Sequence, residues 1–194
     1  IYVDTGAMYR AMALYMIEHK IDVSHLDEVG SACDAITIDI QYSAGEQQVI
    51  LNGKNVNDFI RTETVSEMSS KISAIPEVRE KLLSLQRSLA AAENVIMDGR
   101  DIGTPILPDA DVKIYLTASS LTRARRRYLE YQEKGEPCDL AEIQKTIEER
   151  DQRDMTREIS PLCQAEDAVL VDSSELTIDE TVEKILSVYH SKVS

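Results

Sequence analysis

Arginines and aspartates gather at several places in this chain, and the first candidate phosphate site is a helical stretch. Arg150, Arg153 and Arg157 follow one another at steps of three and then four residues within the segment 149–157. This spacing predicts that the three guanidinium groups lie on one face of a helix. Guanidinium groups bind phosphate oxygens two hydrogen bonds at a time, so this face could hold a polyanion. The alternative is a solvated helix whose arginine and aspartate side chains pair with one another.

A second candidate is the turn 98–103, which directly follows a short apolar segment and reads Asp-Gly-Arg-Asp-Ile-Gly. In open parallel sheets, ligands bind at the carboxyl ends of the strands. Arg100 could therefore hold a phosphate, and Asp101 could accept a hydrogen bond from an amino group. A tight turn with a local aspartate–arginine pair would explain the same residues without a ligand.

The same rule about strand ends selects two further places. One is the segment 4–10, where Thr5, Tyr9 and Arg10 are the polar candidates. Its alternative interpretation is a helix N-cap followed by ordinary helix residues. The other place is Asp172, directly after the apolar run that ends at Val171.

A dense group of arginines occurs in one predicted helix, at Arg123, Arg125, Arg126 and Arg127. It could contact a nucleotide or a phosphate. The alternative is a solvated face that balances Glu130 and Glu133, and this is the interpretation that we favour for Arg125. We do not expect binding to nucleic acid, because no aromatic residues alternate with these arginines to stack bases.

The composition predicts a globular protein of one large domain, or one domain with an insertion. The 194 residues are 43% hydrophobic, and the formal net charge of −14 argues against a general nucleic-acid binder, although a small anion responds only to local charge. The three cysteines form neither a zinc pattern nor a disulfide framework, which favours a cytoplasmic location. No apolar run approaches the length that spans a membrane, so we expect no membrane partner.

The order of apolar segments predicts an α/β fold with a mostly parallel sheet and helices on both faces. Parallel strands are expected at 1–4, 95–97, 112–116 and 168–171, and an antiparallel hairpin at 37–42 and 48–52 around a turn at 43–46. The expected helices span 7–20, 25–36, 61–75, 77–92, 119–133, 140–154 and about 177–189, the last with a Thr177–Glu180 capping box. We therefore expect a core of residues 1–19 and 94–194 with an insertion at 20–93.

Short motifs along the chain resemble those of the bacterial cytidylate kinases, which are nucleoside monophosphate kinases of the P-loop class. The motifs are DTGAMYR at 4–10, IRT at 60–62, IPEVRE at 75–80, DGRDIGT at 98–104, LPDA at 107–110, KIYLTAS at 113–119 and ERDQRDMTR at 149–157. The resemblance runs from residue 1 to about 190. It implies a P-loop kinase core, a monophosphate-binding insertion that contains the small antiparallel sheet, and a helical lid at about 135–160.

The resemblance also implies the reaction and its substrates. The γ-phosphate of ATP, which enters with Mg²⁺, would pass to CMP or dCMP and give the diphosphate. Such a transfer needs positioning and charge neutralisation more than a protein nucleophile, and it implies no metal ligands on this chain. The complete enzyme would be a monomer whose partners are CMP, dCMP and ATP.

Residue roles follow from the resemblance in the same way. The cytosine edge would be read by Ser70, Arg79 and Asp101, with Asp101 accepting from the exocyclic amino group and Arg79 donating to the ring acceptors. The CMP phosphate would be held by Arg10, Arg100 and Arg157, the ribose hydroxyls by Arg150 and Asp154, and the pocket would be lined by Thr5 and Tyr9. The lid would carry Arg153 and Arg157, which would act with Arg100 on the transferring phosphate, and ATP would contact Arg126 or Arg127.

One motif of the family, the phosphate loop G-x-x-x-x-G-K-[ST], does not occur in the printed sequence. In the family it lies N-terminal to the DTGAMYR motif, so we expect the first strand, the loop and the first helix to precede Ile1 in the natural protein. That strand would lie between those at 95–97 and 112–116, which should then not pair with each other and leave open sheet edges. We expect that this chain alone does not bind ATP productively.

Two other functions remain open from the sequence. The chain could be a nucleotide-binding module without catalysis, because its monophosphate pocket is nearly complete and its ATP site is not. It could also be a P-loop kinase for UMP or another small acceptor, although the combination of Ser70, Arg79 and Asp101 argues against this.

Overall fold

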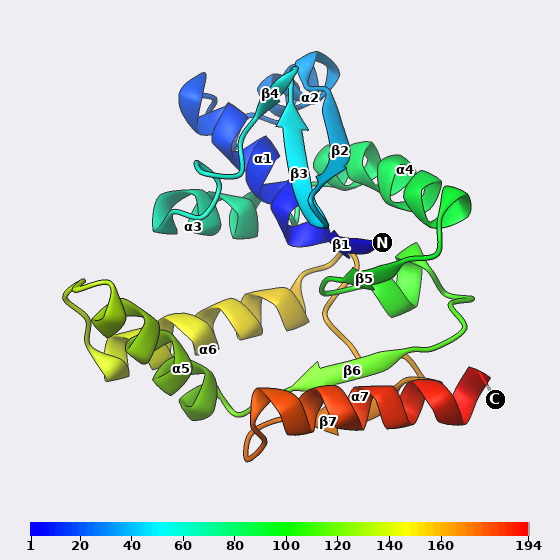
Figure 1. Ribbon diagram of the computed structural model, residues 1–194. Coiled ribbons are helices and arrows are strands. Elements are labelled where there is room, and N and C mark those ends of the chain that lie inside the picture. Colours follow the sequence, from blue (N-terminus) through cyan, green and yellow to red (C-terminus); the bar gives the residue numbers. More distant parts are fainter. Residues whose placement is uncertain (194) are drawn as a thin grey trace. The chain divides into compact units, whose positions relative to one another are not determined.

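The fold consists of two compact units, Ile1–Ile102 and Gly103–Ser194, in a computed structural model that describes residues 1–193. Figure 1 labels the helices and strands of both units. The boundary between the units falls inside the segment 94–194 that we expected to belong to one core. The expected division into core, lid and insertion therefore remains a prediction, and each unit is described by itself.

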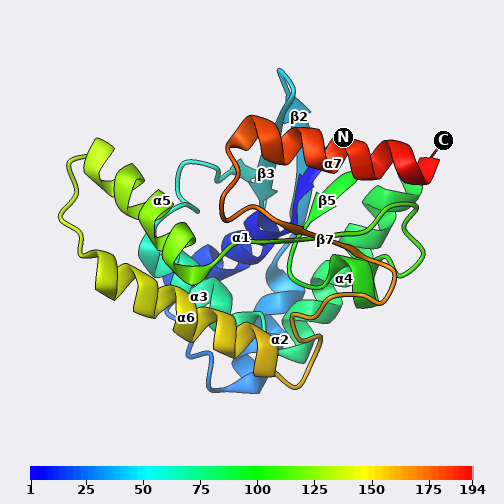
Figure 2. The ribbon, with the colours of Figure 1, turned by 90° about the horizontal axis from the view of Figure 1, so that it is seen from below.

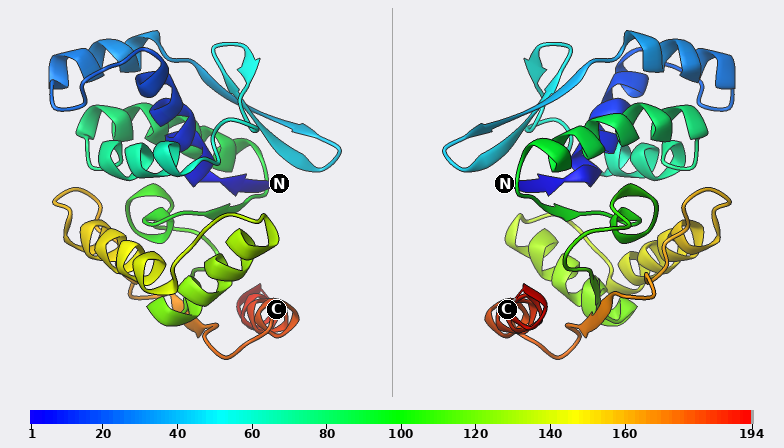
Figure 3. Two further views of the ribbon diagram at one scale, coloured as in Figure 1. Left: turned by 90° about the vertical axis from the view of Figure 1, so that its left-hand side faces the viewer. Right: turned by 90° about the vertical axis from the view of Figure 1, so that its right-hand side faces the viewer.

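The first unit combines one parallel strand pair, a small antiparallel sheet and four helices. In chain order the elements are β1 (Tyr2–Asp4), α1 (Thr5–Glu18), α2 (Leu26–Ala35), β2 (Ile38–Ser43), β3 (Glu46–Leu51), β4 (Lys54–Asn55), α3 (Glu63–Ile72), α4 (Pro76–Ala92) and β5 (Ile96–Asp98). Val3 of β1 lies opposite Met97 of β5 in parallel register. Ile40 lies opposite Val49 in the antiparallel pair β2–β3, which confirms the predicted hairpin. The views in Figure 3 show this hairpin extending away from the helices of its unit.

Helix α1 forms the centre of the first unit. Its sequence is rich in alanine, methionine and leucine, which favour helices, and these side chains are buried on more than one face. Met8, Met12 and Met16 are fully buried and follow one another at four-residue steps, so they form one continuous stripe. The hydrophobic cluster around α1 includes residues of α2, β2, β3, α3 and α4. This packing fixes the helix that carries Tyr9 and Arg10.

The start of α1 differs from the expectation that Thr5 and Gly6 form a turn before the helix. Both residues are helical, and Asp4 is the N-cap, whose Oδ1 accepts a hydrogen bond from the backbone N–H of Ala7 at 3.0 Å. Aspartate caps a helix as well as a hydroxyl residue does. The hydroxyl of Thr5 is consequently available for another contact and donates to the carbonyl oxygen of Asp98 at 2.7 Å.

The second unit contains a separate parallel strand pair and three α-helices. Its elements are β6 (Ile114–Thr117), α5 (Ser120–Glu133), α6 (Leu140–Thr156), β7 (Val169–Asp172) and α7 (Ile178–Val193). Leu116 of β6 lies opposite Val171 of β7. Helices α5 and α6 lie side by side (Figure 2), and Arg123 binds both carboxylate oxygens of Asp151 between them. A short π-helical turn, η1 (Ile102–Ile106), was not predicted.

The parallel strands form two separate pairs, β1–β5 and β6–β7, in the part of the chain that the structure describes. The parallel strands, covering helices and small antiparallel sheet together confirm the predicted α/β fold class. Among residues 1–193, no helix combines the length and the apolar character that crossing a membrane requires.

The predicted capping box at the start of α7 is confirmed. Oε2 of Glu180 accepts from the backbone N–H of Thr177 at 2.8 Å, and Oγ1 of Thr177 accepts from the backbone N–H of Glu180 at 3.2 Å. The hydrogen bond from the Thr177 backbone is the main cause that lowers the pKa of the Glu180 carboxyl below its ordinary value. The charged carboxylate therefore stabilises the folded state above the unfolded-state pKa, and this stabilisation is lost as the pH falls through the folded-state pKa.

Exchanging Glu180 for glutamine is expected to make the stability of the protein less sensitive to acid. Glutamine can keep the hydrogen bond to Thr177 but cannot be protonated in this range. Thermal unfolding at about pH 7 and about pH 3 measures the effect, and the midpoint of Glu180→Gln should fall less between the two than that of the wild type. An equal fall in both proteins would contradict a contribution from the Glu180 carboxylate.

Candidate active site

A buried ion pair joins α4 to the chain segment after β5. Nη2 of Arg79 donates to Oδ2 of Asp101, and the side chains of the two residues are only 9% and 6% exposed. Nη1 of Arg79 donates to the carbonyl oxygen of Ser73 at 2.9 Å, so the guanidinium is held by two partners. Buried charges are tolerated where they are paired and hydrogen-bonded in this way. The pair places an anionic acceptor next to a planar cationic donor.

Two further predicted residues lie beside this pair. The ring of Tyr9, on α1, lies 5.8 Å from the guanidinium carbon of Arg79, within the range of a cation–π contact. Ser70, on α3, is buried and is linked to Arg79 through Ser73, whose hydroxyl donates to the carbonyl oxygen of Ser70 at 2.9 Å. The structure thus brings together the three residues predicted to read the cytosine edge and Tyr9, which was predicted to line the pocket; they come from α1, α3, α4 and the segment after β5.

The start of α1 carries the second part of the candidate site. Nη1 of Arg10 lies 3.5 Å from Oδ2 of Asp4, and Nη2 of Arg61 lies 2.8 Å from the same oxygen. Burial is the main cause that lowers the pKa of the Arg10 guanidinium, Asp4 opposes this shift, and the charges of Arg61 and Arg100 add to it. Arg10 and Arg100, both predicted to bind phosphate, therefore share one electrostatic environment. Arg61 was not predicted, although it lies in the IRT motif.

The turn that holds Arg100 and Asp101 is fastened directly to α1. The hydrogen bond from the Thr5 hydroxyl to the carbonyl of Asp98 brings Thr5 against Gly99. A Cβ atom at Gly99 would lie 2.5 Å from Oγ1 of Thr5 and 2.9 Å from Cδ1 of Ile102. Both distances are shorter than real Cβ contacts, so the close approach requires glycine at this position. Thr5 acts here by setting the position of the turn.

The lid residues predicted in the second unit lie on α6 or at its C-terminal cap. Arg150 and Asp154 lie on α6, with Nε of Arg150 3.9 Å from Oδ2 of Asp154, and Arg153 is exposed on the same helix. Arg157 is the C-cap of α6, where the backbone turns to an extended conformation. Its Nε donates to the carbonyl oxygen of Ser160 at 2.7 Å. The backbone N–H of Arg157 still donates to the carbonyl oxygen of Arg153 at 3.1 Å, so Arg157 continues the last turn of α6 and the common face stays a prediction.

The arginines of α5 have protein partners that we did not predict. Two carbonyl oxygens, those of Ser173 and Leu176, accept from Nη2 of Arg126 at 2.6 and 3.4 Å. Nε of Arg127 donates to the hydroxyl of Tyr131 at 3.0 Å. Arg123 pairs with Asp151, whereas Arg125, for which we favoured a solvated face, is exposed. Asp172 accepts from the backbone and hydroxyl of Ser174, which gives it a role in a local turn.

Comparison with known proteins decides the family. The profile of the family described as "Cytidylate kinase" matches residues 1–191. The chain is 49% identical to the cytidylate kinase of Lactobacillus johnsonii over 192 residues, which cover 99% of this chain and 84% of the relative. It is 46% identical to that of Caldicellulosiruptor saccharolyticus over 193 residues, covering 100% of this chain and 85% of the relative. The chain belongs to the cytidylate kinase family.

Membership of the cytidylate kinase family makes the chain a transferase of the nucleoside monophosphate kinase class. The family assignment agrees with the resemblance seen in the short motifs and covers the same extent of chain. The motif DTGAMYR contains Tyr9 and Arg10, and IPEVRE contains Arg79. The motif DGRDIGT contains Arg100 and Asp101. These residues all belong to the first unit, where the contacts above join Tyr9, Arg79 and Asp101.

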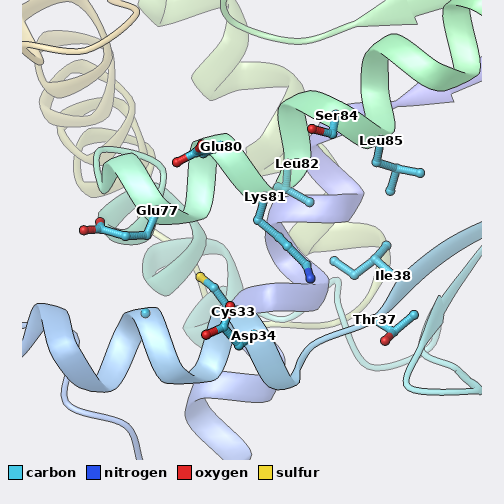
Figure 4. Close-up of a pocket in the computed structure, with 11 residues that line it drawn as sticks. Cys33, Asp34, Thr37, Ile38, Glu77, Glu80, Lys81, Leu82, Ser84 and Leu85 are labelled. Atoms are coloured by element: carbon cyan, nitrogen blue, oxygen red, sulfur yellow. The ribbon is translucent and has the colours of Figure 1, made fainter.

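The first unit also contains a cavity that is lined by residues other than those predicted for the active site. It has a volume of about 600 Å³ and opens between α2, the start of β2 and α4, as Figure 4 shows. Its lining includes Cys33, Glu77 and Lys81 and contains none of the predicted site residues. Burial raises the pKa of the Cys33 thiol, which makes it a weak nucleophile. Although this cavity is large, its lining therefore does not indicate the site of the kinase reaction.

Proposed function

We propose that the predicted site residues serve a reaction in which the γ-phosphate of ATP passes to CMP or dCMP and forms CDP or dCDP. The observation that carries the proposal is the buried Arg79–Asp101 pair beside Tyr9 and Ser70 in a chain of the cytidylate kinase family. Cytosine presents an amino donor next to its ring acceptors. A carboxylate next to a guanidinium offers the complementary acceptor and donors.

We assign the other parts of CMP to residues on the basis of the family resemblance. Arg10, Arg100 and Arg157 would bind the phosphate, and Arg150 and Asp154 would bind the ribose. Thr5 would line the pocket and hold the turn at Gly99. Arg10 and Arg100 are close enough to interact electrostatically, which is compatible with one phosphate between them, and Asp4 is the carboxylate that faces Arg10 in the structure.

We assign the transfer step to positioning and charge neutralisation. ATP would enter as the phosphate donor with Mg²⁺ bound to it, and Arg100, Arg153 and Arg157 would neutralise charge on the transferring group. Arg126 or Arg127 would contact ATP after exchanging its present protein partners. The residues that the structure describes contain no group of three or more histidine, cysteine, aspartate or glutamate side chains arranged to hold a metal ion. Mg²⁺ is therefore treated as part of the substrate.

We also propose that the enzyme is a cytoplasmic monomer that acts on free nucleotides and not on nucleic acids or membranes. The net charge of −14 supports this choice of substrate, because it opposes general attraction to polyanions.

Calorimetric titration with CMP and UMP tests the proposal. We expect saturable binding of CMP and binding of UMP that is at least about tenfold weaker, because the Asp101 carboxylate would face the O4 oxygen of uracil. Formation of CDP after addition of ATP and Mg²⁺ is measured on the same protein. CMP binding without CDP formation would favour the nucleotide-binding module, and equal affinity for UMP would favour a kinase with another acceptor. Failure to bind CMP would contradict the proposal altogether.

A further inference from the structure

Arg61 lies at the same carboxylate oxygen as Arg10, although none of the predicted roles includes it. It follows the buried residue Ile60 and precedes Thr62, the N-cap of α3. The two guanidinium groups approach Oδ2 of Asp4 from positions far apart in the sequence, at 2.8 Å for Arg61 and 3.5 Å for Arg10. The Asp4 carboxylate therefore faces two cations.

The carboxylate of Asp4 is held firmly in this position. Oδ1 accepts from the N–H of Ala7 as the cap of α1. The side-chain amide of Gln47, on β3, binds both backbone groups of Asp4, accepting from its N–H at 2.8 Å and donating to its carbonyl at 3.2 Å. Asp4 is thus a fixed point, and the arginines that approach Oδ2 are the groups that can move.

Arg61 is well suited to exchange its partner. Its side chain is 64% exposed, and a single nitrogen, Nη2, makes the ion pair with Asp4. Because water can solvate the exposed guanidinium when the pair opens, Arg61 can leave Asp4 and turn toward another anion. A phosphate monoester carries more charge than a carboxylate and presents oxygens that fit the guanidinium fork.

Gly6 lies beside Asp4 and Arg10 and adds no side chain to the space next to them. A Cβ atom at Gly6 would lie 3.1 Å from Oδ1 of Asp4 and 3.4 Å from Nη2 of Arg10, which is tighter than ordinary contact. Any larger residue would press on the guanidinium of Arg10. Gly6 therefore leaves Arg10 room to present its nitrogens beside those of Arg61.

We propose that Arg61 binds the phosphate of the acceptor nucleotide together with Arg10, and that the ligand-free protein holds it on Asp4. The inference rests on the proposed function, because it assigns a further residue to the acceptor site. If Arg61 contacts the phosphate, it contributes to the preference for a nucleotide over the corresponding nucleoside. It does not contribute to recognition of the base.

Calorimetric titration of CMP and cytidine into the 194-residue chain and its variants tests this inference. Arg61→Ala is expected to weaken CMP binding about tenfold to hundredfold, the range for losing a hydrogen bond to a charged group, and to change cytidine binding less than about twofold. Arg61→Lys keeps the charge but not the fork, so its affinity for CMP should lie between those of the wild type and Arg61→Ala. Lys54→Ala is the matched control, since it removes one exposed positive charge from the same unit.

The outcomes separate this inference from the proposed function. If the wild type binds CMP and Arg61→Ala binds it equally well, the role of Arg61 is overturned while the kinase proposal stands. If Lys54→Ala weakens CMP binding as much as Arg61→Ala, general electrostatic attraction replaces the specific contact. Absence of CMP binding by the wild type overturns both. An unchanged thermal midpoint of Arg61→Ala, expected from its exposed side chain, shows that the variant is folded.

Discussion

Replacing Asp101 with asparagine is expected to weaken CMP binding about tenfold to hundredfold and to remove most of the preference for CMP over UMP. The carboxylate would lose its charge, and hydrogen bonds to charged groups contribute about 1.5–3 kcal/mol. The asparagine amide can turn its NH₂ group toward the O4 oxygen of uracil, which the carboxylate cannot do. UMP binding should therefore stay the same or improve while CMP binding falls.

The position of Asp101 makes an effect on stability unavoidable, and it must be separated from recognition. Asp101 and Arg79 are both buried, so removing the charge of one leaves the other with a weaker partner. The double variant Arg79→Met/Asp101→Leu removes both charges and fills the space with apolar groups. Such replacements of buried pairs are often neutral or stabilising. We expect this double variant to recover the thermal midpoint that Asp101→Asn loses, and still to bind CMP poorly.

The control for Asp101→Asn is the same change at Asp172, the last residue of β7. The Asp172 carboxylate accepts hydrogen bonds from Ser174 in a local turn, so Asp172→Asn should leave the ratio of CMP to UMP affinity unchanged. Titration of both nucleotides into the three variants measures this ratio. An unchanged ratio in Asp101→Asn would exclude Asp101 from reading the base.

The parts of the fold that depend on local chemistry were predictable from the sequence. The hairpin β2–β3 follows from two alternating segments around Ala44 and Gly45, and the structure has the expected antiparallel pairing with both turn residues at positive φ. The capping box of α7 likewise depends on the residue types at Thr177 and Glu180. These features involve neighbours within a few residues, where spacing and side-chain type suffice.

Helix ends were less predictable, because several polar residues can compete for the same cap. Asp4 and Thr5 could each begin α1, and the choice of Asp4 depends on a distant carbonyl that engages the Thr5 hydroxyl. At its C-terminal end, α6 continues to Thr156, two residues beyond the end predicted at residue 154. Periodicity indicates which residues could share a face but does not say where the helix stops.

The candidate site was predictable only through motifs, because its pairs are distant in sequence. Arg79 and Asp101 are 22 residues apart, and neither spacing nor composition indicates that they meet. Arg61 shows the limit more clearly, since its partner Asp4 lies 57 residues away. A motif that contains an arginine does not reveal which carboxylate it approaches. Such contacts emerge only when the packing of α1, α3 and the hairpin is known.

The largest structural effect is expected from Gly99→Ala, which adds one methyl group at the closest contact in the site. The new Cβ would lie 2.5 Å from Oγ1 of Thr5 and 2.9 Å from Cγ1 and Cδ1 of Ile102. Overpacking of this kind costs about 1–3 kcal/mol. Relief requires the turn to move away from α1, and that turn carries Arg100 and Asp101. We therefore expect a lower thermal midpoint together with at least about a tenfold loss of CMP affinity.

The contact with Thr5 provides an internal test of this cause. In Thr5→Ala/Gly99→Ala the Oγ1 atom is absent, so the shortest contact disappears while the contact with Ile102 remains. The double variant should recover part of the CMP affinity that Gly99→Ala loses, although it lacks the hydrogen bond to the Asp98 carbonyl. Gly30→Ala is the matched control, because a Cβ there meets no atom within 4 Å and alanine favours α2. If Gly99→Ala proves as harmless as Gly30→Ala, the turn does not depend on its close approach to α1, and the position of Asp101 must be set by its pair with Arg79 instead.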